Sequence, residues 1–414
     1  YNYSFGGAQA AALAQNRIGN SRLEWESTTV TNFGVDAGFL NNRLTAELDV
    51  YNKVTDGILT TPNLHLTMGI KTPPTMNTAE VTNRGFELTV GWKDHVGDFN
   101  YAVSTNFSYN HNEVTKYLGK YEAGWVEKDG KKVWQSNIGD VSVDKDKGRI
   151  VEGHPIKEYY TLNTYSGNGT HFNSDGSVNI NGGPKDGMIR TEGDMKWLNA
   201  MIDAGYKFMP NQSVGRNNIY YGDLIYADLN GDGIYGSSYD YDFQGSSAMP
   251  KFGYGINISA SWKNFDLSML WAGNGGFKLY WEEDPYNSVA IRNGFATSER
   301  VANDHYFYDP ENPTDSRTNL NGYIPRLVEN SKQSRQTSNY YLYNGTYMKL
   351  KNLTIGYTLP VTLTEKISAE RVRVYLSGEN LFTITSFPGQ DPEMGATTNY
   401  PSLRQFAAGI SVTF

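Results

Sequence analysis

Hydrophobic and polar positions alternate along many stretches of this chain, and their two parities differ in the same way each time. In residues 99–110 the odd positions are mainly aromatic or aliphatic, whereas the even positions are Asn, Ser and Ala. Residues 252–262 repeat the pattern, with glycine, serine and asparagine on the polar parity. A period of two predicts β-strands with one apolar and one polar face. Further stretches of this kind are residues 44–50, 86–92, 265–271, 353–359, 372–376 and 406–414.

The lengths of these segments favour strands that cross a membrane. There are about ten of them, each near the ~9 to 11 residues that a tilted strand needs to span hydrocarbon. Aromatic residues stand at the ends of the apolar faces, as Phe252 and Trp262 do, where the interfacial girdles of a barrel belong. The pattern therefore predicts an all-β fold, a transmembrane antiparallel β-barrel in the outer membrane.

The connections between the segments differ greatly in length. Residues 93–98 and 263–264 form short turns, whereas residues 116–159, 167–251 and 276–340 form very long loops. Short turns at one end and long extracellular loops at the other are typical of outer-membrane barrels. A soluble β-sandwich or propeller is the alternative, because its strands also alternate.

The last nine residues give a further indication of a barrel. Five apolar residues alternate with small or polar ones, and the chain stops on an aromatic residue. Such a terminal strand resembles the signal by which outer-membrane barrels are recognised for assembly. The residues expected to carry this signal are Phe406, Ile410, Val412 and Phe414.

Composition agrees with a sheet that has one wet and one lipid-facing side. Charged residues make up 19% of the chain and aromatic residues 14%, alongside 43 glycines and no cysteine. The formal net charge of -8 argues against nucleic-acid binding. No apolar run approaches the ~18 to 20 residues of a membrane helix. Because the sequence starts at Tyr1 without a signal peptide, we expect a fragment or a mature segment.

Enzymatic patterns are weak, so we predict that the chain is not an enzyme. The six histidines are scattered without a pair at helical metal spacing, and there is neither a phosphate-binding loop nor a Gly-x-Ser-x-Gly elbow. Paired carboxylates for glycoside hydrolysis stay open, because only folding brings them together.

A series of short motifs runs across nearly the whole chain. The motifs are residues 22–26 (RLEWE), 83–87 (NRGFE), 153–156 (GHPI), 228–233 (DLNGDG), 250–254 (PKFGY), 347–353 (YMKLKNL), 356–360 (GYTLP), 378–382 (GENLF) and 391–393 (DPE). In this order the motifs resemble the C-terminal half of SusC-like (RagA-like) TonB-dependent transporters.

This resemblance implies a barrel of about 22 strands with an N-terminal plug. Residues 1–414 are then expected to be the C-terminal part of the barrel, with the plug and the N-terminal strands outside this chain. The expected partners are a SusD-like surface lipoprotein that closes over the mouth, the TonB complex acting through the missing plug, and membrane lipid. The cargo is an oligosaccharide, favoured by the abundant aromatics, or alternatively an oligopeptide as in RagA. A secreted glycan-binding or glycan-cleaving β-sandwich protein is a second hypothesis.

One of these motifs has the spacing of a calcium loop. Oxygen-bearing side chains stand at its positions 1, 3 and 5, a glycine at 6 and a backbone carbonyl at 7. Position 12 is Tyr239 where a carboxylate is wanted, so a nearby acid would have to substitute. The alternative is that these side chains cap tight turns. The candidate ligands for Ca²⁺ are Asp228, Asn230, Asp232, Ile234 and Asp240.

The last long loop is rich in aromatic residues interspersed with acids. Aromatic faces stack on sugar rings, so these residues are candidates for substrate binding. In the alternative interpretation, the loops use the same aromatics to fold on themselves or to contact the lipoprotein. The candidates are Tyr280, Trp281, Tyr306 and Tyr308.

Charged residues on the polar parity of the strands are expected to face water or the plug, because a charge at mid-bilayer on the lipid side costs ~2 to 4 kcal/mol. We expect them to contact the plug rather than substrate. They are Glu47, Asp49, Arg371, Arg373 and Glu379.

Overall fold

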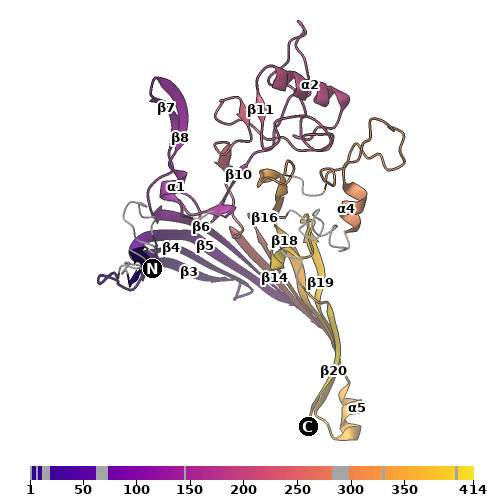
Figure 1. Cartoon of the computed structure of the whole chain (residues 1–414). Helices are drawn as coiled ribbons and strands as arrows, with labels where there is room; N and C mark the ends of the chain where they lie inside the picture. Colours follow the sequence, from indigo (N-terminus) through magenta and orange to yellow (C-terminus); the bar gives the residue numbers. More distant parts are fainter. Residues whose placement is uncertain are drawn as a thin grey trace.

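The computed structural model describes residues 2–5, 8–11, 19–61, 73–143, 146–281, 298–328, 332–396 and 400–414. Its main element is one antiparallel sheet of nine strands, curved in space, with the order β20-β19-β18-β15-β14-β6-β5-β4-β3 (Figure 1). In chain order its strands are β3 (Ser27–Phe39), β4 (Leu44–Thr60), β5 (Met76–Val96), β6 (Phe99–Lys116), β14 (Phe252–Trp262), β15 (Phe265–Gly275), β18 (Tyr347–Thr358), β19 (Arg371–Thr385) and β20 (Gln405–Thr413).

The register of the sheet places the apolar parity of every strand on one face. Ile256 of β14 lies opposite Trp271 of β15 and Thr105 of β6, and the same correspondence continues outward to Phe33 in β3 and Ile410 in β20. This apolar face is exposed, as expected for a surface that meets lipid. Large apolar side chains exposed on it include Phe33, Val35, Leu48, Trp262, Phe265, Ile355, Leu376, Phe406 and Ile410.

The two ends of the sheet carry connections of different size. At one end the links are residues 40–43, 97–98, 263–264 and 359–370, the last with α5 (Val361–Thr364) and η4 (Glu365–Ile367). At the other end they are residues 61–75, 117–251, 276–346 and 386–404. Figure 1 shows the long connections gathered at the end of the sheet away from α5. The predicted asymmetry between turns and loops is confirmed.

Residues 117–251 form one folded excursion between β6 and β14, whereas the sequence suggested two separate loops. Its core is built on α2, around Trp197, which is fully buried and stacks on Tyr165. Thr191 and Asp194 close a capping box at the start of that helix. The elements are β7 (Ala123–Lys128), β8 (Lys131–Ser136), α1 (Ile138–Val141), β9 (Gly148–Arg149), β10 (Glu158–Leu162), α2 (Glu192–Asp203), β11 (Lys207–Phe208), β12 (Ile234–Tyr235) and β13 (Tyr241–Phe243).

The next long connection packs on this excursion. The Tyr306 hydroxyl donates to the carbonyl of Arg190 at 2.5 Å, and Arg326 pairs with the buried carboxylate of Asp223 at 2.6 Å. The two long connections therefore share one hydrophobic core. The remaining elements are β16 (Lys278–Tyr280), α4 (Glu299–Asp304), η3 (Asn339–Tyr341), β17 (Leu342–Asn344), η5 (Pro392–Met394) and the hairpin of β1 (Asn2–Phe5) and β2 (Ala8–Ala11).

Two expectations about the fold can be compared directly with the structure. The sequence suggested about ten strand segments, and nine strands form the large sheet of the described residues. Within those residues the sheet has two free edges, β3 and β20. In the described part of the chain, no helix is long and apolar enough to cross a membrane.

Candidate functional site

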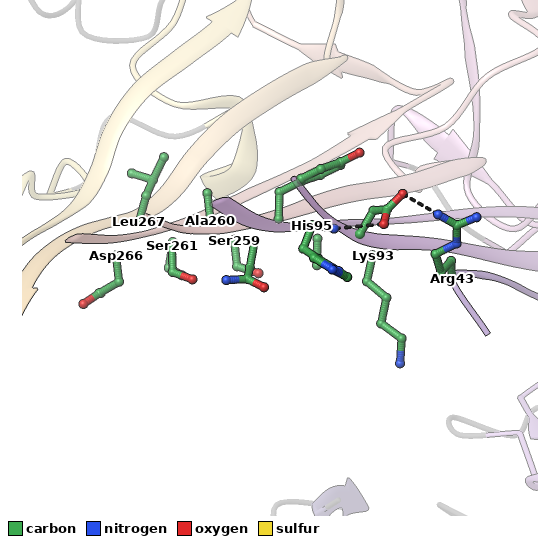
Figure 2. Close-up of a pocket in the computed structure, with 13 residues that line it drawn as sticks. Arg43, Lys93, His95, Ser259, Ala260, Ser261, Asp266 and Leu267 are labelled. Carbon is green, nitrogen blue, oxygen red and sulfur yellow. Dashed lines mark hydrogen bonds and ion pairs between the residues drawn. The ribbon is translucent and has the colours of Figure 1, made fainter. Parts of the chain in front are cut away.

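The face of the sheet opposite the apolar one is polar. Figure 2 shows this at the short-turn end, where Lys93, Ser259 and Asp266 point to one side of the sheet and Ala260 and Leu267 to the other. A transmembrane sheet with one polar face can line an aqueous passage on that side. We therefore take the polar face, with the loops above it, as the candidate site.

Part of this polar face carries acids without cationic partners. Asp36 lies directly opposite Glu47 in the register of β3 and β4, and Asp49 lies opposite Glu87 in that of β4 and β5. Within the described residues none of the four forms an ion pair, although Asn32 donates to Asp49 at 2.9 Å. Facing like charges are unfavourable across strands. Another part of the protein that brings positive charge here would relieve the repulsion.

Elsewhere on the same face Arg373 is paired. Its guanidinium binds the carboxylate of Asp266 through two hydrogen bonds, which join β19 to β15 across β18. At the turn end, Arg43 binds Asp94 at 2.9 Å, but Asp94 shares the parity of Trp92 and belongs to the apolar face. Of the charges expected to contact the plug, Arg373 thus has a partner within the barrel wall. Contact of Glu47, Asp49, Arg371 and Glu379 with a plug stays a prediction.

At the loop end, a buried ion-pair network holds the β19–β20 connection against the wall. The ammonium of Lys349, on β18, lies 2.6 Å from Asp391 and 2.7 Å from Glu393. Lys349 is only 1% exposed and Asp391 6%. Lys351 also binds Glu393, and Ser402 donates to Asp391. These residues were not singled out from the sequence as a site.

A β-bulge explains why sequence parity missed Lys349. Counting back in twos from Leu353, which faces lipid, places position 349 on the apolar face. In the structure the register between β15 and β18 shifts by one residue, so that Leu350 lies opposite Trp271 and Lys349 opposite Ala272. The extra residue turns Lys349 to the polar face. The sequence did contain one indication of this site, a lysine at a position that strict alternation assigns to the apolar face.

A tyrosine-rich cavity of about 300 Å³ lies beside this network. Tyr159, Phe277, Tyr280 and Tyr347 contribute rings, and Glu393 contributes a carboxylate. Burial raises the pKa of Tyr159, and its neutral phenol donates a hydrogen bond to the carbonyl of Lys278 at 3.1 Å. The arrangement resembles a binding cavity with a mainly apolar lining and few polar groups.

The aromatic residues predicted to bind substrate lie mostly inside the folded loops. Tyr306 is fully buried in the shared core, and Tyr308 packs against that core, with its ring 5.0 Å from that of Tyr221. Trp281 is 6% exposed and its ring meets that of Phe387 edge-on. Tyr280, at 9%, borders the tyrosine-rich cavity. The alternative interpretation of the sequence was that these aromatics pack within the loops, and in the structure they do pack there. Stacking of substrate on them stays a prediction.

In the predicted calcium loop, the side chains accept hydrogen bonds from nearby backbone amides. The Asp228 carboxylate accepts from Gly231, Asp232 and Gly233 at 2.7 to 3.2 Å. Asp240 accepts from Leu229 at 2.8 Å and from Ser237 at 2.7 Å.

The rest of the loop is bonded in the same way. Asn230 Oδ1 accepts from the amide of Asp232, and Asp232 Oδ1 accepts from the amide of Ile234. Within the described residues no group of three or more His, Asp or Glu side chains is arranged to hold a metal ion. Calcium binding at this loop stays a prediction.

The terminal strand lies at one edge of the sheet, paired with β19 from Arg371 to Glu379. Its signal residues all point to the apolar face and are exposed: Phe406 by 77%, Ile410 by 69%, Val412 by 42% and Phe414 by 85%. Their place on one face agrees with the alternation. Their role in assembly stays a prediction.

Comparison with known proteins gives consistent matches. The model of the family described as TonB dependent receptor-like, beta-barrel matches residues 1–208. The TonB-dependent receptor P3 of Formosa agariphila is 26% identical over 99% of this chain, and the TonB-dependent receptor SusC of Bacteroides thetaiotaomicron is 25% identical over 95%. The chain spans about a third of each relative's length, 36% and 32% respectively.

Among solved structures, the RagAB peptide importer in its open-open state matches with a TM-score of 0.66 and 22% identity. The match covers all of this chain and 37% of that one. At this identity the likeness concerns the fold alone.

Proposed function

Because the chain belongs to the TonB-dependent receptor-like β-barrel family, we propose that it forms the wall and outer mouth of a transporter that imports oligomeric nutrients. The sheet lies in the outer membrane, with its apolar face toward lipid. In this proposal the polar face lines the passage, the acids of β3 to β5 meet a plug, and TonB drives uptake through that plug. A SusD-like surface lipoprotein would close over the long loops.

One observation carries this proposal: the described parts of residues 117–251 and 276–346 fold into a single body with its own core, at the end of the sheet away from α5. A loop body of this kind provides a fixed surface around an entrance, whereas separate mobile loops would not. The one large nine-stranded sheet and the family match both argue against the alternative of a secreted β-sandwich.

Oligosaccharides are the cargo that we propose first. Tyr323 is 40% exposed on the loop body, its ring stacks on that of Tyr340 at 4.9 Å, and Arg300 lies 5.9 Å from it. The exposed part of this stacked tyrosine pair suits contact with a sugar ring. Oligopeptide import is the second candidate, and the likeness to the RagAB peptide importer favours it.

The test is mass spectrometry of material that co-purifies with the full-length protein and any companion lipoprotein. Masses spaced by a sugar residue would support the first cargo, and masses spaced by amino-acid residues the second. Uptake of the identified oligomer should be lost in cells without TonB. Uptake that persists without TonB would contradict the proposed function.

A further inference from the structure

The small sheet of β9, β10 and β13 separates two cavities in the loop body. Successive residues of a strand point to opposite sides. Tyr159 of β10 accordingly lines the tyrosine-rich cavity, whereas Tyr160 lines a second cavity of about 530 Å³ on the other side. The two cavities are therefore neighbours across one strand.

The second cavity has a cationic lining. Lys147 and Arg149 both border it, together with the rings of Tyr160 and Tyr241. The Lys147 ammonium lies 3.7 Å from the centre of the Tyr280 ring, which borders the first cavity, and the Arg149 guanidinium lies 5.7 Å from the centre of the Tyr160 ring. Aromatic faces attract cations, so each ring stabilises the positive charge beside it.

Arg149 is the unusual member of this group. Within the described part of the chain its guanidinium makes neither an ion pair nor a hydrogen bond, and its Nε is buried without an acceptor. The residue opposite it in the register is Glu158, but that carboxylate is occupied by His154 at 2.8 Å and by the amide of Gly245 at 2.6 Å. A half-buried guanidinium without an acceptor is costly.

Other acids near the cavity do not neutralise Arg149. Asp146 borders the cavity but is exposed and lies 3.9 Å from Lys157. Asp242 is also exposed, and it accepts a hydrogen bond from the amide of Phe243 at 2.8 Å. The lining thus holds two cations and one carboxylate.

The backbone fixes the position of Arg149. A side chain at Gly148 would place a Cβ 2.7 Å from the carbonyl oxygen of Lys157, so β9 can approach its neighbour only through a glycine. The amide of Tyr160 donates to the carbonyl of Lys147 at 2.8 Å. The guanidinium is thereby held in place before any ligand arrives, which lowers the entropic cost of binding.

We propose that this cavity binds a carboxylate of the transported oligomer. The terminal nitrogens of Arg149 match a carboxylate in geometry, Lys147 adds positive charge, and the rings of Tyr160 and Tyr241 contact the adjoining part of the ligand. Two sources supply this chemistry, the uronic acid of an acidic glycan and the free carboxyl end of a peptide. The inference rests on the proposed import of oligomers and specifies their charge.

The experiment measures binding to the full-length transporter, purified with any companion lipoprotein. One pair of probes is an oligogalacturonate and its neutral methyl ester, and the other is a peptide with a free carboxyl end and its amide. The variants are Arg149→Ala, Arg149→Lys and the double variant with Lys147→Ala. Lys131→Ala, on the exposed β7–β8 hairpin, is the matched control for loss of one surface charge.

We expect the acidic member of one pair to bind more tightly than its neutral counterpart. Arg149→Ala should weaken that binding by about tenfold or more, the usual scale for a charged hydrogen bond. Arg149→Lys should restore part of it, Lys131→Ala should change nothing, and salt should weaken acidic binding only. The pair that responds identifies the source of the carboxylate.

Neutral and acidic members that bind equally well, or an Arg149→Ala protein with unchanged acidic binding, would overturn this inference and leave oligomer import standing. Failure of all four probes to bind, together with no oligomer co-purified from cells, would overturn both. Circular dichroism of each variant separates a lost contact from a lost fold.

Discussion

The guanidinium of Arg373 reaches across Gly356 to bind the carboxylate of Asp266. These two residues lie on β19 and β15, and Gly356 belongs to the strand between them. A Cβ at Gly356 would lie 2.4 Å from an Arg373 nitrogen and 2.5 Å from an Asp266 oxygen. The ion pair therefore needs a glycine beneath it, and it links three neighbouring strands on the polar face.

Replacing this glycine should break the link. Gly356→Ala forces the pair apart, and we expect a loss of about 1 to 3 kcal/mol in stability, the usual cost of overpacking. The measurement is thermal unfolding of the full-length protein in detergent. Gly124→Ala, at a position on β7 with no atom near the new Cβ, is the control and should be neutral. Equal unfolding temperatures for the two variants would show that the pair tolerates a side chain.

Loss of the Lys349 ammonium should release the β19–β20 connection. Lys349→Met leaves the Asp391 carboxylate buried without a cation, and breaking a buried pair in this way costs ~3 to 5 kcal/mol. We expect faster proteolysis within residues 386–404. Lys366→Met removes a lysine exposed at the opposite end of the sheet and should leave that rate unchanged. A Lys349→Met protein as resistant as the parent would contradict the role of the network.

The same network should weaken in acid. Burial alone would raise the pKa of Asp391, but hydrogen bonds from Lys349 and Ser402 outweigh it and hold that pKa below its ordinary value. The pKa of Glu393 is also lowered, because hydrogen bonds from Lys349 and Lys351 outweigh the effect of burial. Their stabilisation is thus present above the ordinary carboxyl pKa of ~4 and is lost as the pH falls through the lowered values. Proteolysis of residues 386–404 should accelerate over that range, and Lys349→Met should remove the acid dependence.

The loop that begins at Asp228 gives separate predictions for its fold and for calcium. Asp228→Ala removes the acceptor of three backbone amides, which should cost about 1 to 3 kcal/mol with or without metal. If the predicted calcium site forms, added Ca²⁺ should raise the unfolding temperature of the parent but not of Asp232→Asn.

Acid should weaken any such binding. Burial raises the pKa of Asp240, so this ligand becomes protonated at a higher pH than an ordinary carboxyl. If added Ca²⁺ does not raise the unfolding temperature of the parent at neutral pH, the calcium prediction is wrong and the Asp and Asn side chains only cap tight turns.

The sequence predicted the sheet better than the loops, for a physical reason. Strand faces follow a local period of two, and apart from the β-bulges the register keeps the apolar parity on one face from Phe33 to Ile410. The loop body depends on contacts between distant positions, such as Tyr306 with Arg190, which no local pattern encodes. Residues 93–96 illustrate a smaller miss: they are polar enough to suggest a turn, yet they complete β5 because the ladder with β6 continues to Val96.

The residues of the candidate site show the same difference between local patterns, which the sequence reveals, and tertiary contacts, which it does not. Aromatic content indicated where the loops would be rich in rings, but it did not indicate that Trp281 and Tyr306 would be buried, because burial is decided by tertiary contacts. Lys349 escaped attention because a bulge changes the parity of the strand at that point. Arg149 was not predicted as a site residue, because its lack of an acceptor among the described residues can be recognised only from the positions of its neighbours.

The terminal strand gives the last prediction. If Phe414 and its neighbours on the apolar face form an assembly signal, Phe414→Ala should lower the amount of folded, heat-modifiable protein in the outer membrane, without changing its synthesis. Thr413 is the control, because it lies on the opposite face and pairs in register with Arg371. Phe414 is 85% exposed, so its loss removes little packing within the described sheet. A folded amount that falls equally in Thr413→Ala would point to loss of strand pairing instead, whereas a fall confined to Phe414→Ala would identify the exposed ring as the recognised feature.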